Sequence, residues 1–305
     1  MNESYKVSVI TATYRRESEL KRSLQSLARQ TFKAFEIILV DDNALPEWND
    51  RVTAIVKEFK EQFPEVQLNY IQNYPSKGSA NARNVGIYAS KGDYVTFLDD
   101  DDLYAPEKIE KQYEYMTAQG LDYSVTDLDL YYDDETLSEH RTRYYIKKTD
   151  QNSLITYHVM HHMACPDTMM FKKEYLWKIG AFPPIDMGDD FYLMERAILN
   201  GGKFGYLNRC DVKAYVHYGE VGLSGGQKNI DYQKSLLKYK KKYYHLLDRK
   251  SIRFTKMRHH AVLAFTYLRM HQKGGFVRES MASFFTDPVA CTKLFAKRRK
   301  KNRGK

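Results

Sequence analysis

Four consecutive aspartates, Asp99 to Asp102, directly follow a run of residues typical of a buried strand, Tyr94 to Leu98. Side chains alternate along a strand, and this run is apolar on both faces, as in the middle of a parallel sheet. Open α/β sheets bind ligands at the carboxyl ends of such strands, which is where these carboxylates lie. Two like charges about 4 Å apart repel by roughly 1 kcal/mol even in water, so a crevice at this edge needs a counter-cation.

Mg²⁺ and Mn²⁺ are the natural counter-cations, because both are hard divalent ions that prefer oxygen ligands. The alternative is that the acids cap the helix expected to begin near Pro106. Capping needs one Asp and not four, so the sequence favours a metal site.

A second pair of acids, Asp41 and Asp42, comes at the end of another expected strand, Phe35 to Val40. In a parallel sheet both acidic strand ends lie at the same edge, which strengthens the interpretation as a site. Taken alone, Asp42 is explained equally well as a turn former.

Arg83 lies in the first turns of a helix that opens near Gly78, and helix N-termini next to glycine bind phosphates. An ordinary solvated helix residue is the alternative. Acids for a metal and a basic side chain for a phosphate together suggest a nucleotide diphosphate. The chain has neither a G-x-G-x-x-G fingerprint nor a Walker loop, so dinucleotide and P-loop sites are disfavoured.

Two further positions carry groups that could take part in chemistry. Asp189 and Asp190 open a helix, where one of them is expected as an N-cap, and an acid there could also serve as a general base. His217 ends a strand beside the glycine-rich segment 219–226, which could close over a ligand; a lone histidine at a strand end is usually structural.

These residues need a scaffold of alternating strands and helices, and the apolar periodicity supplies one. Strands are expected at 7–13, 35–40, 66–71 and 94–98, with helices at 19–30, 49–61 and 77–89 between them. Beyond Gly120 the alternation loosens, with strands expected at 121–130, 141–147, 168–171 and 211–217 and helices at 173–179 and 188–196. The pattern predicts an α/β fold with one mostly parallel, Rossmann-like sheet flanked by helices.

In this order and spacing, the motifs resemble an inverting family 2 glycosyltransferase with the GT-A fold, over roughly Lys6 to Ser224. The segments that carry the resemblance are Val7–Tyr14, Gln30–Phe32, Glu36–Asp42, Gly78, Ala82–Gly86, Phe97–Asp102, Lys178–Phe182 and the pair Asp189-Asp190, six residues before Arg196.

The resemblance implies a role for each position. Thr11, Thr13 and Tyr14 would line the nucleotide pocket, Asp42 would accept a hydrogen bond from the base, and Arg83 would lie beside the nucleotide. Asp99 or Asp100 would face the ribose, and Asp101 would bind the metal with His217 as a further ligand. Asp190 would be the catalytic base, although the family pair is more often Glu-Asp, which leaves Asp189 open.

The function implied is metal-dependent transfer of a hexose from a UDP-sugar to a glycan or lipid-linked acceptor, in cell-surface polysaccharide biosynthesis. One alternative is a catalytically silent GT-A domain that serves as a nucleotide-sugar-binding or scaffold protein. A nucleotidyltransferase is a third option, but it gives no reason for Asp190 and His217.

Charge is divided unevenly along the chain. The net charge is +9, but residues 229–305 hold 21 Lys and Arg against 4 Asp and Glu, while residues 1–228 are acidic overall. We therefore expect a glycosyltransferase domain at 1–228 and a basic helical extension at 229–305. The extension suits an anionic membrane surface, with a solvated tail as the alternative; nucleic acid is not expected, because no recognition motif accompanies the charge.

The expected cellular location of the protein is inferred from features that the sequence does not show. Three widely spaced cysteines form neither a disulfide framework nor a zinc motif, no apolar run reaches 18 residues, and the polar N-terminus does not resemble a signal peptide. We expect a cytoplasmic protein that could lie peripherally on the inner face of the cell membrane.

Overall fold

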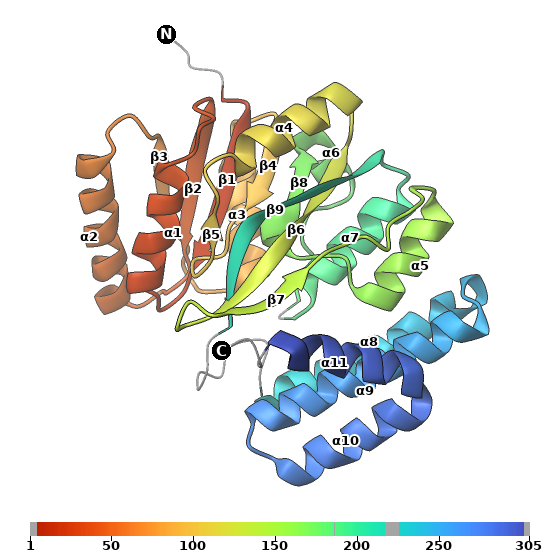
Figure 1. Cartoon of the computed structure of the whole chain (residues 1–305). Coiled ribbons are helices and arrows are strands. Elements are labelled where there is room, and N and C mark those ends of the chain that lie inside the picture. The colour runs from red at the N-terminus through yellow and green to blue at the C-terminus, as the bar shows by residue number, and fades with distance from the viewer. Residues whose placement is uncertain (1–4, 186, 217–225, 302–305) are drawn as a thin grey trace. The chain divides into compact units, whose positions relative to one another are not determined.

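The structure is a computed structural model that describes residues 5–185, 187–216 and 226–301, with side chains as far as residue 294 (Figure 1). The chain forms two compact units. Unit 1 comprises Met1–Leu130, His140–Thr149 and Ala164–Tyr215, and unit 2 comprises Tyr131–Glu139, Asp150–Met163 and Val216–Lys305. The boundary expected at residues 228–229 remains a proposal about domains.

The described strands form one sheet. They are β1 (Val7–Thr13), β2 (Phe35–Asp41), β3 (Leu68–Gln72), β4 (Tyr94–Phe97), β5 (Leu103–Tyr104), β6 (Tyr123–Tyr132), β7 (Leu137–Arg141), β8 (Met169–Lys172) and β9 (Phe204–Val216). Their order is β3-β2-β1-β4-β8-β6-β9-β5, with β7 paired to β6.

The first half of the sheet is parallel and the second half is not. β3, β2, β1 and β4 run in parallel, with Val7 opposite both Phe35 and Tyr94. β8 then pairs antiparallel with β4, placing Met170 opposite Thr96. Consequently the segment before β8 reaches the same edge of the sheet as the segment after β4.

Helices of unit 1 connect these strands. They are α1 (Ser18–Ala28), α2 (Pro46–Gln62), α3 (Ser79–Ala89), α4 (Lys108–Gln119), the 3-10 helix η1 (Pro166–Thr168), α6 (Lys173–Lys178) and α7 (Asp189–Leu199). Gly86 lets α3 lie close against β1, because a Cβ at that position would come within 2.4 Å of Ile10 Cγ2. The predicted α/β fold is confirmed.

The sequence prediction fails locally in several places, including the strand expected at 211–217, because β9 already begins at Phe204. The strand expected at 141–147 is wrong, because β7 ends at Arg141. The Arg143 N–H instead donates to the Asp127 side chain (2.8 Å), so it is not available to a strand ladder. The helix α5 (Gln151–His161) was not predicted, although Asp150 caps it by accepting from the Ser153 N–H (3.0 Å).

Helices dominate unit 2, as expected for the C-terminal extension. Besides α5 they are α8 (Gly226–Lys240), the 3-10 helix η2 (Lys241–Leu246), α9 (Arg249–Arg269), α10 (Lys273–Thr286) and α11 (Pro288–Lys301), drawn in shades of blue in Figure 1. Ile230, Leu263 and Tyr267 form a small apolar core with Phe276 packed against it. No described helix has an apolar stretch long enough to cross a membrane.

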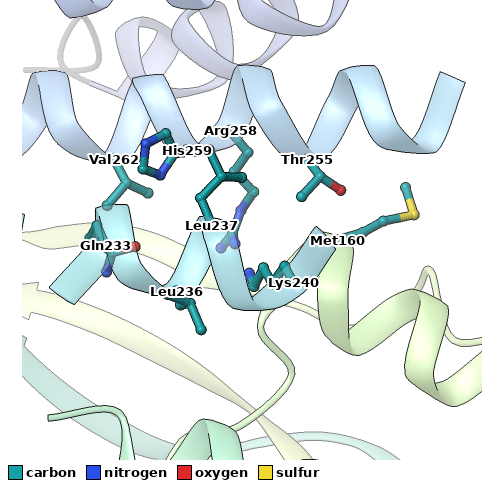
Figure 2. A pocket seen from close by; sticks show the side chains of 9 residues that line it. All are labelled: Met160, Gln233, Leu236, Leu237, Lys240, Thr255, Arg258, His259 and Val262. Carbon is teal, nitrogen blue, oxygen red and sulfur yellow. The ribbon is translucent and has the colours of Figure 1, made fainter. Parts of the chain in front are cut away.

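A small pocket lies among α5, α8 and α9 (Figure 2). Leu236, Leu237 and Val262 give it apolar walls, and the Lys240, Arg258 and His259 side chains add basic groups. Burial, together with the Arg258 charge, lowers the pKa of Lys240 to about 7.

Candidate functional site

The acidic run lies at the carboxyl edge of the parallel strands. β4 is buried along its whole length, and Leu98 continues it by donating to the Ile10 carbonyl (3.0 Å). The chain then turns, with the Asp102 N–H donating to the Asp99 carbonyl (3.1 Å). This turn directs the four carboxylates to different partners.

Three carboxylates converge at this turn: Asp99, Asp102 and Asp167, each with one oxygen within 4.8 Å of the others. Asp167 belongs to η1, just before β8, and accepts a hydrogen bond from the Asp99 N–H (2.7 Å). Burial and the charge of Asp99 raise the pKa of Asp167 to about 7. Burial and the charge of Asp167 likewise raise the pKa of Asp102.

The raised pKa values of Asp102 and Asp167 mean that burial and mutual repulsion disfavour the ionised forms of these two carboxylates, and a bound cation would offset this cost. Clustered carboxylate oxygens are the ligands that Mg²⁺ and Mn²⁺ prefer, so the residues present fit a divalent metal. The metal ligands that the sequence suggested are Asp101 and His217. Asp101 forms an ion pair with Arg16 (3.0 Å) and is not one of the three converging acids. His217 lies outside the described residues.

Asp100 is held by the end of β1. It accepts hydrogen bonds from the Thr13 hydroxyl (2.7 Å) and the Tyr14 N–H (3.2 Å). Burial and the neighbouring Asp101 charge raise the pKa of Asp100 to about 8. The Thr11 hydroxyl, also on β1, is buried without a hydrogen-bond partner among the described residues. The structure thus brings Thr13, Tyr14 and the acidic run together.

Asp42 organises the loop that leads into α3. Its carboxylate accepts from the Asn73 side chain (2.6 Å), the Ser76 hydroxyl (2.9 Å) and the Gly78 N–H (2.9 Å). Gly78, with φ of 85°, precedes the first residue of α3. Asp42 is therefore buried and already well supplied with donors from the protein, and its predicted role toward a base remains a prediction.

Arg83 links the acidic run to α7. Its guanidinium donates to Asp99 (2.6 Å) and to Asp189 (2.9 Å), and it lies over the Phe182 ring. Burial alone would lower the pKa of Arg83, but the charges of Asp99 and Asp189 raise it above its usual value. Arg83 is thus a permanently charged group between two carboxylates.

The two acids at the start of α7 differ in environment. Asp189 is buried and paired with Arg83; burial raises its pKa to about 6, although the Arg83 charge opposes the shift. Asp190 is only partly buried, and its carboxylate accepts from the Phe191 N–H (2.7 Å). Because Asp189 is buried and paired with Arg83, Asp190 is the better placed of the two acids to contact a substrate.

Two residues at the site escaped the sequence analysis, Asp167 and Arg16. Asp167 lies 68 positions after Asp99 and directly precedes an expected strand. Had that strand been recognised as antiparallel to β4, an acid at its start would have been expected at the acidic edge. Arg16 follows β1 closely in sequence. Its position two residues after the Val7–Tyr14 segment was the only feature of the sequence that could have indicated a role at the site.

A second group of possible metal ligands, Asp129, His140 and Cys210, lies on β6, β7 and β9. His140 and Cys210 are exposed, and His140 already pairs with Asp129. Exposed acidic groups like this are common without a metal, so the buried group around Asp167 is the better candidate.

The sheet and its acidic edge have the GT-A fold of glycosyltransferases. The chain belongs to glycosyl transferase family 2, whose family model matches residues 8–180. An uncharacterized glycosyltransferase of Methanocaldococcus jannaschii is 30% identical over 211 residues, which cover 68% of this chain and 69% of that protein.

A relative named for its activity and two solved structures are also similar. WfaP of Escherichia coli, named as a UDP-Glc:alpha-D-GlcNAc-diphosphoundecaprenol beta-1,3-glucosyltransferase, is 27% identical over 70% of this chain and 79% of its own. S. aureus TarS 1-349 in complex with UDP-GlcNAc matches with a TM-score of 0.61 and 17% identity, covering 92% of this chain and 91% of its own. Mannosyltransferase PcManGT from Pyrobaculum calidifontis, in complex with GDP-Man and Mn²⁺, gives a TM-score of 0.57 and 16% identity over 99% of this chain and 89% of its own.

Proposed function

We propose that this glycosyltransferase moves a hexose from a UDP-sugar to a hydroxyl of a glycan or lipid-linked acceptor, with inversion, in cell-surface polysaccharide biosynthesis. The observation that carries the proposal is the link from the acidic run through Arg83 to Asp189, beside Asp190. It joins a place for a diphosphate to a place for a general base. The name of WfaP, a UDP-sugar enzyme with a lipid-linked acceptor, supports the donor and acceptor classes.

The nucleotide would lie along the carboxyl ends of β1, β2 and β4. Thr11, Thr13 and Tyr14 line its pocket, Asp42 faces the base, and Asp99 or Asp100 faces the ribose. Arg83 balances charge beside the diphosphate. A divalent metal, Mn²⁺ or Mg²⁺, would neutralise the charge that develops on the leaving diphosphate. The acidic run would hold it, with Asp101 and His217 as the ligands predicted from sequence and Asp102 and Asp167 as those favoured by the geometry.

Asp190 acts as the base. Its carboxylate takes the proton of the acceptor hydroxyl as that oxygen forms a bond to the anomeric carbon, and the bond from this carbon to the diphosphate breaks. Attack from the side opposite the leaving group gives inversion. We further propose that the protein is cytoplasmic and peripheral at the membrane, with residues 1–228 as the transferase domain and 229–305 as the extension.

Asp190→Asn tests the mechanism. We expect transfer, measured as UDP released from a panel of UDP-sugars with Mn²⁺ and acceptor, to fall by about 10²- to 10⁴-fold, the usual contribution of a general base. Thermal stabilisation by UDP and Mn²⁺ should persist, because the substitution leaves the donor site intact. Asp189→Asn is the matched control, and it should lower thermal stability because Arg83 loses a partner. Wild-type transfer by Asp190→Asn would place the base elsewhere.

The same binding assay separates the two sets of metal ligands. If the converging acids bind Mn²⁺, Asp167→Asn should lower the affinity for Mn²⁺. The loss should be at least roughly 10- to 100-fold, which is the usual effect of mutating a residue that only supports a metal ligand. Asp101→Asn then has the smaller effect. The reverse order would support Asp101 as the ligand, and no Mn²⁺ effect on UDP binding or turnover in the wild type would refute the metal itself.

A further inference from the structure

Helix α10 has its polar and apolar faces reversed compared with an ordinary surface helix. Its buried positions are polar, Glu279 and Ser283, whereas large apolar side chains point outward. The outward set, here called the outer stripe, consists of Val277, Met281, Phe284, Phe285 and Val289, which are between 46% and 74% exposed.

Helical spacing puts the outer stripe on one side. Val277, Met281 and Phe284 follow one another at intervals of four and three residues, so they share a face. The Phe284 and Phe285 ring centroids are 5.8 Å apart, and Val289, four residues after Phe285, is exposed in the first turn of α11. A contiguous exposed apolar surface of this kind marks an interaction site.

The inner face fixes this orientation of α10. Glu279 pairs with His260 on α9 (2.8 Å), and the Ser283 hydroxyl donates to the Met257 carbonyl (3.1 Å). Gly275 brings the two helices together, because a Cβ there would come within 2.5 Å of Tyr267 Cδ1. Rotating α10 to bury the stripe would break these contacts, so the apolar face belongs outside.

The charges around the stripe have one sign. The two acids of this segment are buried and paired: Glu279 of α10 with His260 and Arg278, and Asp287, between α10 and α11, with Arg253 (3.2 Å). The cations Lys273, Arg278 and Lys293 are exposed. From residue 273 to the end, the sequence holds ten Lys and Arg against these two acids.

We propose that the outer stripe docks the protein on an anionic lipid bilayer, with the apolar side chains in the interfacial layer and the exposed cations against headgroup phosphates. An apolar face bordered by cations is the pattern of helices that lie in the plane of a membrane. A second copy of the chain fits less well, because it would bring like-charged borders together. This inference rests on the peripheral placement proposed above and identifies the surface responsible.

The test uses the full chain and lipid vesicles in a flotation assay. Wild type should float with phosphatidylglycerol-containing vesicles and much less with neutral phosphatidylcholine vesicles. The double variant Met281→Gln, Phe285→Gln should lose about tenfold or more in partitioning, as expected for removing buried apolar area from an interfacial helix. Leu268→Gln is the matched control, because Leu268 is 47% exposed on α9 outside the stripe. It should bind as wild type does.

A second pair of substitutions tests the charges. Replacing Lys273 and Lys293 by Gln should reduce binding roughly fivefold for each charge removed. All these side chains are exposed, so thermal melting should not fall, and UDP binding measured on the same samples reports separately on the transferase site. Undiminished flotation of the double variant would overturn the proposal. A second result would also overturn it: the wild type forms a dimer in sedimentation velocity, the double variant does not, and the wild type does not bind vesicles.

Discussion

Arg83 shows how one residue can serve structure and chemistry together. It is buried, and its guanidinium holds Asp99 of the acidic turn and Asp189 of α7. Removing one partner of a buried ion pair typically costs about 3–5 kcal/mol, because the remaining charge is left without compensation. The positive charge that would lie beside a diphosphate therefore also joins two elements that are distant in sequence.

The sequence identified part of this site and not the rest. The run Asp99–Asp102 was predictable, because four acids after a buried strand have few structural explanations. Asp167 was not, because its position depends on the antiparallel register of β8 against β4, which local periodicity does not encode. The partners of individual acids, such as Arg16 for Asp101, depend on loop conformations that residue types alone do not determine.

Lys240 offers a prediction about pH. Its folded-state pKa is about 7, below the usual 10.5, so between these values the unfolded chain binds more protons and stability rises with pH. Lys240→Met should therefore stabilise the protein most below pH 7, on the order of 2–4 kcal/mol, and progressively less toward pH 10. Urea unfolding at pH 6.5, 8 and 9.5 measures the change.

The neighbouring Lys241 provides the control for this prediction, because its side chain is exposed. Lys241→Met should change stability little and without the same pH trend. A constant effect of Lys240→Met across the range would show that the Lys240 charge is not destabilising in the folded state.

At the scale of elements, predictions succeeded where apolar periodicity was strong. The strands of the parallel half match the expected ranges within about two residues, the usual uncertainty of element ends. The second half was harder. The segment expected as a strand at 141–147 is held by the Arg143 N–H, which donates to the Asp127 carboxylate, a long-range contact that local sequence cannot reveal.

The crossing of α9 and α10 depends on Gly275. Gly275→Ala would push a Cβ into the Tyr267 ring, and overpacking of this kind costs about 1–3 kcal/mol. Its neighbour is a matched control, because nothing lies within 4 Å of a Cβ at Gly274. Gly274→Ala should be neutral or stabilise α10 by up to about 1 kcal/mol, since alanine favours helix. Thermal melting of both variants checks this, and equal effects would contradict the close approach.

Considering the whole molecule, the described residues of the proposed donor site all belong to unit 1. A ligand that binds only the folded protein stabilises the folded state by mass action, by about 2.7 kcal/mol when its concentration is a hundred times Kd. UDP with Mn²⁺ should therefore slow amide hydrogen exchange around residues 98–102 and in α7, and EDTA should reverse the change. Helices α9 and α10 should exchange at the same rate with or without ligand; equal protection there would show that the two units respond as one.

The insertion of β8 beside β4 also sets an order of events during synthesis. Asp99 and Asp102 leave the ribosome 68 and 65 residues before Asp167 does, which corresponds to roughly 3–14 s of translation. A nascent chain can assemble the parallel strands in that interval, yet the three carboxylates proposed to hold the metal are incomplete until the later segment arrives. Under the proposed function, binding of a metal ion therefore has to wait until the segment that carries Asp167 has been made.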